Sequence, residues 1–344
     1  MNRLQSFQNA PFRPALSCGL VWSALTFTSL AQAADPALLD QALKFFQPLP
    51  ATMATADNPT SPDRVALGRR LFFDKRLSLD GTVSCETCHL PGLHGTDGLA
   101  KSIGVQHRPN ARNAPTVLNA ALQFKAHWDG GRDSVEDQAT RALIGPASFG
   151  NPDYPAVIAK LKSLGYEEAF KKAFPGEADP IKPENWGKAI GSYERTLVTP
   201  APFDEFLNGN ANSLSAEAQR GLKTFMDVGC SNCHRGVAVG GDSFQKFGIF
   251  GDYWTATGQA AADEGRFALT RDPNDRYRFK TPGLRNVAMT PPYFHDGSVD
   301  DLAQAVRIMG KLQLGLELGP DQVQSLVAFL GSLTGATPKS FVAP

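Results

Sequence analysis

Two Cys-x-x-Cys-His pentapeptides contain the residues of this chain best suited to chemistry. They occupy residues 85–89 and 230–234. In such a pentapeptide the two cysteines form thioether bonds to a porphyrin, and the adjoining histidine becomes the proximal ligand of its iron. The spacing predicts two covalently bound c-type haems. The cysteines that would attach them are Cys85, Cys88, Cys230 and Cys233, and the proximal ligands would be His89 and His234.

Other interpretations of the four cysteines explain fewer of these residues. A zinc site made of two Cys-x-x-Cys pairs would use four thiolates and would leave His89 and His234 without a role. A pair of thioredoxin-like dithiols would require a βαβ context that the sequence lacks. Disulfides within the two loops would also leave the histidines unexplained. The haem interpretation is therefore preferred.

The N-terminal segment predicts export. Arg3 and Arg13 precede an apolar stretch over residues 16–30, which ends in the Ala-Gln-Ala of residues 31–33. This order is typical of a secretory signal, here cleaved after Ala33, and the stretch is short for a retained membrane helix. Cys18 lacks the sequence context of a lipid anchor. We expect a periplasmic protein with no membrane-spanning segment.

A short internal repeat indicates a duplicated architecture. Residues 68–74 and 221–227 both fit Gly-x-x-x-Phe-x-Asp, and each copy precedes one of the two haem motifs. The length that remains after residues 1–33 suits two domains. We predict two related cytochrome c-like domains, residues 34–200 and residues 201–344, joined by a Pro-rich linker around residues 199–202.

The periodicity of apolar residues predicts an all-α fold with long loops. Residues 155–174 and 183–197 show helical spacing, each with a proline near its start. After residues 319–321 a final helix carries one apolar stripe, formed by Val323, Leu326, Val327, Leu330 and Leu333. The 32 glycines and 25 prolines imply long connections, as expected where haem supplies much of the core. The formal net charge of zero favours neither nucleic acid nor an anionic membrane.

The sixth ligands of the two irons would decide their chemistry. Met309 lies before the predicted final helix and is a candidate for the second iron, with Met289 as its competitor. A thioether ligand stabilises reduced iron, so a His/Met pair gives a high potential suited to electron storage. The alternative role for Met309 is that of a flexible filler of the core.

The chain resembles the bacterial dihaem cytochrome c peroxidases across nearly all of the expected mature sequence. The stretches that carry this resemblance are residues 71–74, 112–119, 128–130, 171–176, 284–287 and 290–295. The resemblance implies that the N-terminal haem is the low-potential site that reduces hydrogen peroxide to water. It also implies that the C-terminal haem, with His234 and Met309, receives electrons from a small cytochrome c or a cupredoxin.

The same resemblance assigns further residues. Trp128 would stand between the haems, where an indole shortens the distance for electron tunnelling. Asn113, Thr290 and Pro292 align with the ligands of a calcium ion between the family's domains, and amide and carbonyl oxygens suit that ion. Members of the family are commonly homodimers, so a homodimer is implied here as well.

The chain departs from the family pattern around the first iron. Many relatives hold a distal histidine there, and the aligned residue is Val105, which cannot ligate iron. His107 is a possible substitute if the loop shifts. Ser148 stands where relatives carry a catalytic glutamate, and a serine hydroxyl is a poor base. Gln138 keeps the distal amide, and His127 is a candidate base.

These departures keep two other functions open. A MauG-like enzyme would use both haems to oxidise side chains of a partner protein, but such enzymes have a tyrosine where Met309 stands. A non-catalytic electron carrier or peroxide sensor is the second alternative, and Val105 and Ser148 favour it.

Overall fold

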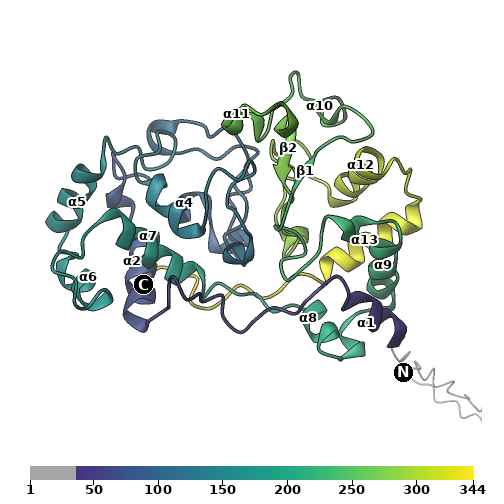
Figure 1. The fold of residues 1–344 in the computed structure, drawn as a ribbon, viewed down its shortest axis with the longest axis horizontal. Coiled ribbons are helices and arrows are strands. Elements are labelled where there is room, and N and C mark those ends of the chain that lie inside the picture. The colour runs from purple at the N-terminus through teal and green to yellow at the C-terminus, as the bar shows by residue number, and fades with distance from the viewer. Residues whose placement is uncertain (1–35) are drawn as a thin grey trace, which may run out of the picture. The chain divides into compact units, whose positions relative to one another are not determined.

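The computed structural model describes residues 36–344 of the chain. The predicted signal sequence and Cys18 lie outside the described residues. The described part is mostly helical, as predicted, and its only sheet pairs two short antiparallel strands, β1 (Phe244–Lys246) and β2 (Arg278–Lys280). Elements of one group surround α7 and those of the other surround α13, as Figure 1 shows. None of the helices in residues 36–344 is both long and apolar enough to cross a membrane.

The first group is built on a crossing between α2 (Pro62–Phe73) and α7 (Pro183–Glu194). Ser61 caps α2 by accepting a hydrogen bond from the backbone N–H of Arg64. Gly68 of α2 lies directly against the backbone of Ala189, where a β-carbon would collide with the carbonyl group. Helix α4 (Val135–Ala142) packs against α7 as well.

The second group repeats this crossing with α9 (Ala216–Asp227) and α13 (Pro320–Gly331). Gly221 of α9 lies against the backbone of Ser325, where again no β-carbon fits. The glycines of the internal repeat, Gly68 and Gly221, therefore occupy equivalent positions. Each allows a helix that leads into a haem motif to approach a later helix closely.

The remaining helices connect and cover these two crossings. One predicted helix, over residues 155–174, is divided into two, because Gly165 adopts a left-handed backbone conformation (φ +73°) between α5 and α6. The helix predicted over residues 183–197 ends earlier, at Glu194. The other α-helices are α1 (Pro36–Ala42), α3 (Cys85–Cys88), α5 (Tyr154–Ser163), α6 (Glu167–Ala173), α8 (Pro202–Leu207), α10 (Tyr253–Ala256), α11 (Phe267–Thr270) and α12 (Leu302–Leu314).

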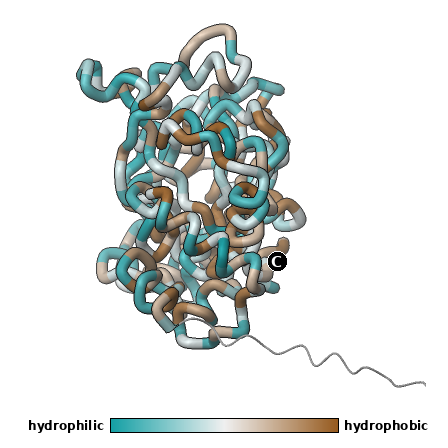
Figure 2. The backbone as a smooth tube through the Cα atoms, turned by 90° about the vertical axis from the view of Figure 1, so that its right-hand side faces the viewer, coloured by the Kyte–Doolittle hydropathy of each residue, from teal (hydrophilic) through white to brown (hydrophobic). Residues whose placement is uncertain are grey.

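Two hydrophobic cores follow from this arrangement, one around each crossing. The first gathers residues of α2, α4, α5, α6 and α7, and the second gathers residues of α1, α8, α9 and α13. Hydrophobic and hydrophilic segments alternate along the chain, as amphipathic helices around a core require (Figure 2). Both ends of the described chain cross between the cores: Phe46 packs in the second core, and Phe341 packs in the first. The domain boundary at residue 200 stays a prediction.

Candidate functional site

A cavity beside α3 collects the residues of the first haem motif. Cys85, Cys88 and His89 line it together. The Nδ1 atom of His89 lies 3.0 Å from the carbonyl oxygen of Gly95. Because a carbonyl only accepts, Nδ1 carries the hydrogen and Nε2 presents its lone pair, as a metal-ligating histidine does. Burial lowers the pKa of His89, so the ring is held neutral.

Helix α4 and the loop after it also contribute to the lining of this cavity. Gln138 and Ser148 both line the cavity. Val105 is completely buried and packs beside Gly150, outside the lining, and its backbone N–H donates to the carbonyl of Ser148. His107 lies exposed on the surface turn that follows and does not line the cavity. Val105 and His107 are thus not among the residues that line this cavity.

His127 lies where the two predicted haem sites meet. Its side chain lines this first cavity and also a second one. Burial lowers the pKa of His127 to about 4, and the nearby Arg132 guanidinium acts in the same direction. The imidazole is therefore neutral near pH 7 and can accept a proton.

The second cavity collects the second haem motif and Met309. Cys230, Cys233 and His234 line one side, and Met309 reaches the same cavity from α12. The competing Met289 is 46% exposed and lies outside this lining. Burial lowers the pKa of His234 to about 4, so this ring is also held neutral.

The chemistry of both cavities fits covalently bound haem. The four motif cysteines form no disulfide, and they are divided between the two cavities. This division removes the four-thiolate zinc site from consideration. Burial raises the pKa of Cys88 to about 11 and that of Cys230 to about 12, so both are held as neutral thiols. Each cavity therefore offers two neutral thiols for thioether bonds and a neutral histidine for the iron.

Trp128 stands in the wall that the two cavities share. It lines both, and its indole Nε1 donates a hydrogen bond of 3.0 Å to the backbone carbonyl of Asn113. Its ring meets the ring of His295 edge to face, with centroids 6.3 Å apart. His295 also stacks on Phe279. An aromatic side chain thus stands in the wall between the sites predicted for the two haems.

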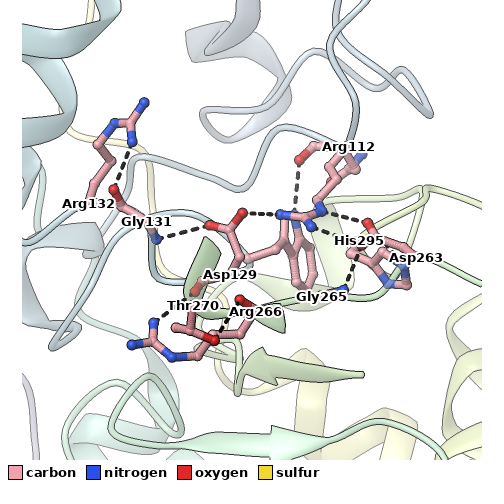
Figure 3. Close-up of polar contacts among 11 residues, drawn as sticks. Arg112, Asp129, Gly131, Arg132, Asp263, Gly265, Arg266, Thr270 and His295 are labelled. Atoms are coloured by element: carbon pink, nitrogen blue, oxygen red, sulfur yellow. Dashed lines mark hydrogen bonds and ion pairs between the residues drawn. The ribbon is translucent and has the colours of Figure 1, made fainter. Parts of the chain in front are cut away.

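An ion-pair network clamps the segment around Trp128 to the C-terminal half (Figure 3). Arg112 donates to the carboxylate of Asp129 at 2.5 Å and forms a bidentate pair with Asp263 at 2.7 and 2.9 Å. Arg266 reaches back from the C-terminal half to the carbonyl of Asp129. Paired charges with two-point geometry hold the shared wall in one arrangement.

The three residues predicted to bind calcium lie along the second cavity. Asn113, Thr290 and Pro292 all line it. The side-chain nitrogen of Asn113 donates to the carbonyl of Leu99, which leaves its Oδ1 atom as a free acceptor. Within residues 36–344 the carbonyl oxygens of Thr290 and Pro292 also accept no hydrogen bond. These oxygens suit a hard cation, and calcium binding stays a prediction.

Sequence reasoning missed two buried charged residues in these cavities, Glu194 and Lys280. Glu194 is 5% exposed and lines the first cavity, and no hydrogen bond reaches its carboxyl group from the described residues. The helical spacing of Ile190, Glu194 and Leu197 was an available signal, because it puts a carboxyl group on an apolar face. Lys280 lines the second cavity, and no local pattern marked it.

Comparisons with known proteins identify relatives that belong to a di-haem family. A family model described as di-haem cytochrome c peroxidase matches residues 62–212. The cytochrome c551 peroxidase of Pseudomonas aeruginosa is 42% identical over 91% of this chain and 90% of its own length. That of Nitrosomonas europaea is 40% identical over 82% of this chain and 83% of its own.

Among solved structures, this fold is similar to that of a MauG-like protein associated with microbial copper homeostasis. The TM-score is 0.76 at 30% sequence identity, over 86% of this chain and 97% of the other. The identity to this MauG-like protein is lower than the identity to the two peroxidases. With such coverage and identity, the chain belongs to the di-haem cytochrome c peroxidase and MauG family.

Proposed function

We propose that this protein is a periplasmic dihaem cytochrome c peroxidase, which reduces hydrogen peroxide to water with electrons from a small redox protein. One observation carries the proposal: the two cavities share Trp128 but differ in their ligands. The second cavity offers His234 and Met309, and the first offers His89 with Gln138 and Ser148. A His/Met pair suits electron storage, and a site without a strong second ligand suits binding of a small oxygen species.

Bound haem would supply the iron that stores electrons and the iron at which peroxide is reduced. The protein residues supply orientation and proton transfer. His127 is neutral near pH 7, so its imidazole can take a proton from the inner oxygen of peroxide and deliver it to the outer one. Gln138 can orient peroxide through its amide. As a thioether ligand, Met309 would favour reduced iron and so give the second site a high potential.

The partner assignments are parts of the same proposal. Ile249 lines the second cavity and is 55% exposed, and the exposed Phe250 is its neighbour in the chain. An exposed apolar surface beside the second cavity suits brief docking of a small cytochrome c or a cupredoxin. We further propose a calcium ion at Asn113, Thr290 and Pro292, and a homodimer, both on the family resemblance.

Donor oxidation tests the proposal directly. Exported protein that contains two haems is mixed with hydrogen peroxide and a reduced small cytochrome c, and donor oxidation is followed by absorbance. We expect rapid oxidation that depends on peroxide. The variant Met309→His should lower the midpoint potential of the second haem and slow donor oxidation, whereas the control Met289→His should do neither. Haem-loaded protein that leaves the donor reduced would favour a carrier, and oxidation confined to a protein partner would favour a MauG-like enzyme.

A further inference from the structure

Lys280 is a buried cation at the junction of the two halves. It ends strand β2 opposite Phe244 of β1, and it is 6% exposed. Its backbone N–H donates a hydrogen bond of 2.7 Å to the carbonyl of Trp128, so the residue is fixed to the shared wall. Its side chain lines the second cavity. The ammonium group is therefore held beside the predicted electron path.

The ammonium group of Lys280 lacks the partner that a buried cation needs. Its Nζ donates to the Oε1 atom of Gln123, a neutral amide, and no carboxylate of residues 36–344 forms an ion pair with it. Two other cations near the junction of the halves are paired: the buried Arg285 with Asp204, and the half-buried Arg112 with Asp129 and Asp263. Burial is the only cause that lowers the pKa of Lys280, to about 8.

A buried charge without a counterion is costly, and a carboxylate supplied by a ligand would remove that cost. The porphyrin of a c-type haem carries two carboxylate side chains, and the cysteines that would attach it line the same cavity as Lys280. We propose that the Nζ of Lys280 pairs with a carboxylate of the haem held by Cys230 and Cys233. This inference rests on the proposed function only in requiring haem at that site.

The pairing gives Lys280 a positioning role in electron transfer. Gln123 comes from the N-terminal half and directs the ammonium group, while the backbone of Lys280 is bonded to that of Trp128. A haem carboxylate bound to Lys280 would therefore be linked to the wall that the two cavities share. A positive charge beside the haem would also disfavour the additional charge of oxidised iron. Lys280 therefore raises the midpoint potential of the second haem.

Spectroelectrochemical titration of the holoprotein tests this role without relying on turnover. Wild type, Lys280→Met and Lys280→Arg are exported with haem attached, and the midpoint potential of each haem is measured at pH 7. We expect Lys280→Met to lower the potential of the second haem more than that of the first, and Lys280→Arg to retain it. Lys246→Met on the paired strand removes an exposed lysine and should leave both potentials unchanged.

A second readout detects the pairing itself. The bending mode of haem carboxylates in resonance Raman spectra should shift in Lys280→Met and not in Lys246→Met. Lys280→Gln, which can keep a hydrogen bond to Gln123, replaces Lys280→Met if the latter does not retain haem. Haem-loaded variants with unchanged potential and Raman mode would overturn the pairing and leave the peroxidase proposal intact. Wild-type protein without haem would instead overturn the proposed function.

Discussion

At the scale of single residues, Glu194 is a buried carboxyl group whose ionised form the fold disfavours. It ends α7 inside the first cavity, and no hydrogen bond reaches its carboxyl group from residues 36–344. Burial raises the pKa of Glu194 to about 8, and the nearby carboxylate of Glu136 acts in the same direction. The fold therefore favours the neutral carboxyl group, whereas the unfolded chain ionises it at its ordinary pKa of about 4.5.

This difference predicts a pH dependence of stability. Between pH 4.5 and pH 8, the folded protein keeps a proton on Glu194 that the unfolded chain has lost. The free energy of unfolding should therefore fall as pH rises through this window, by at most about 1.4 kcal/mol per pH unit. Glu194→Gln removes the titration and should flatten the dependence in denaturant unfolding of the holoprotein. Glu168→Gln on α6, where the carboxylate is exposed, is the matched control, and equal slopes in both variants would contradict the prediction.

The residues of the haem motifs were found in the sequence and the buried charges were missed, for a physical reason. A haem attachment motif is a local sequence pattern, so Cys85, Cys88 and His89 can be recognised from the sequence alone. The cost of burying Glu194 or Lys280 depends on segments far away in the chain, such as Gln123 beside Lys280. The role of Trp128 came from family resemblance, and its place between two cavities required the three-dimensional structure.

At the scale of secondary-structure elements, the two helix crossings are the repeated unit of the fold. In each crossing a glycine of the Gly-x-x-x-Phe-x-Asp repeat touches the backbone of a later helix, Gly68 with Ala189 and Gly221 with Ser325. The repeat showed in advance that the chain is duplicated. The division of residues 155–174 into α5 and α6 was not foreseen, because apolar spacing continues across the turn at Gly165.

The glycine contacts predict a position-specific loss of stability. Gly221→Ala places a β-carbon into the carbonyl of Ser325, so α9 and α13 must move apart. We expect the free energy of unfolding to fall by about 1–3 kcal/mol or more, in the range of overpacked cores. Gly331→Ala is the control, because a β-carbon there has no neighbour within 4 Å among residues 36–344 outside its own helix. A loss for Gly331→Ala equal to that for Gly221→Ala, in urea unfolding of the holoprotein, would refute the close-approach explanation.

At the scale of the whole described chain, both ends stabilise the half to which they do not belong in sequence. Phe46 near the start packs in the second core, edge to face with Phe203. The last residues return from α13 to the first core, as Figure 1 shows. Apolar periodicity could not predict these crossings, because helical spacing such as that of Leu38 and Ala42 in α1 does not show which core the helix will join. Neither half has a complete core without the crossing segment.

The C-terminal crossing predicts that a substitution among the last residues of the chain destabilises the region around the first cavity. Phe341 is completely buried against Phe72, and Arg69 of the same helix donates to the carbonyl of Val342. Phe341→Ala should lower the free energy of unfolding by about 3–5 kcal/mol, as other buried Phe→Ala changes do. Because Phe72 belongs to α2, which leads to Cys85 and Cys88, the first haem should lose its native absorption at lower temperature than the second. The control is Val342→Ala, which shortens an exposed side chain and should behave as wild type. If both haems of Phe341→Ala lost their native absorption at the same temperature, the tail would not stabilise the first core selectively.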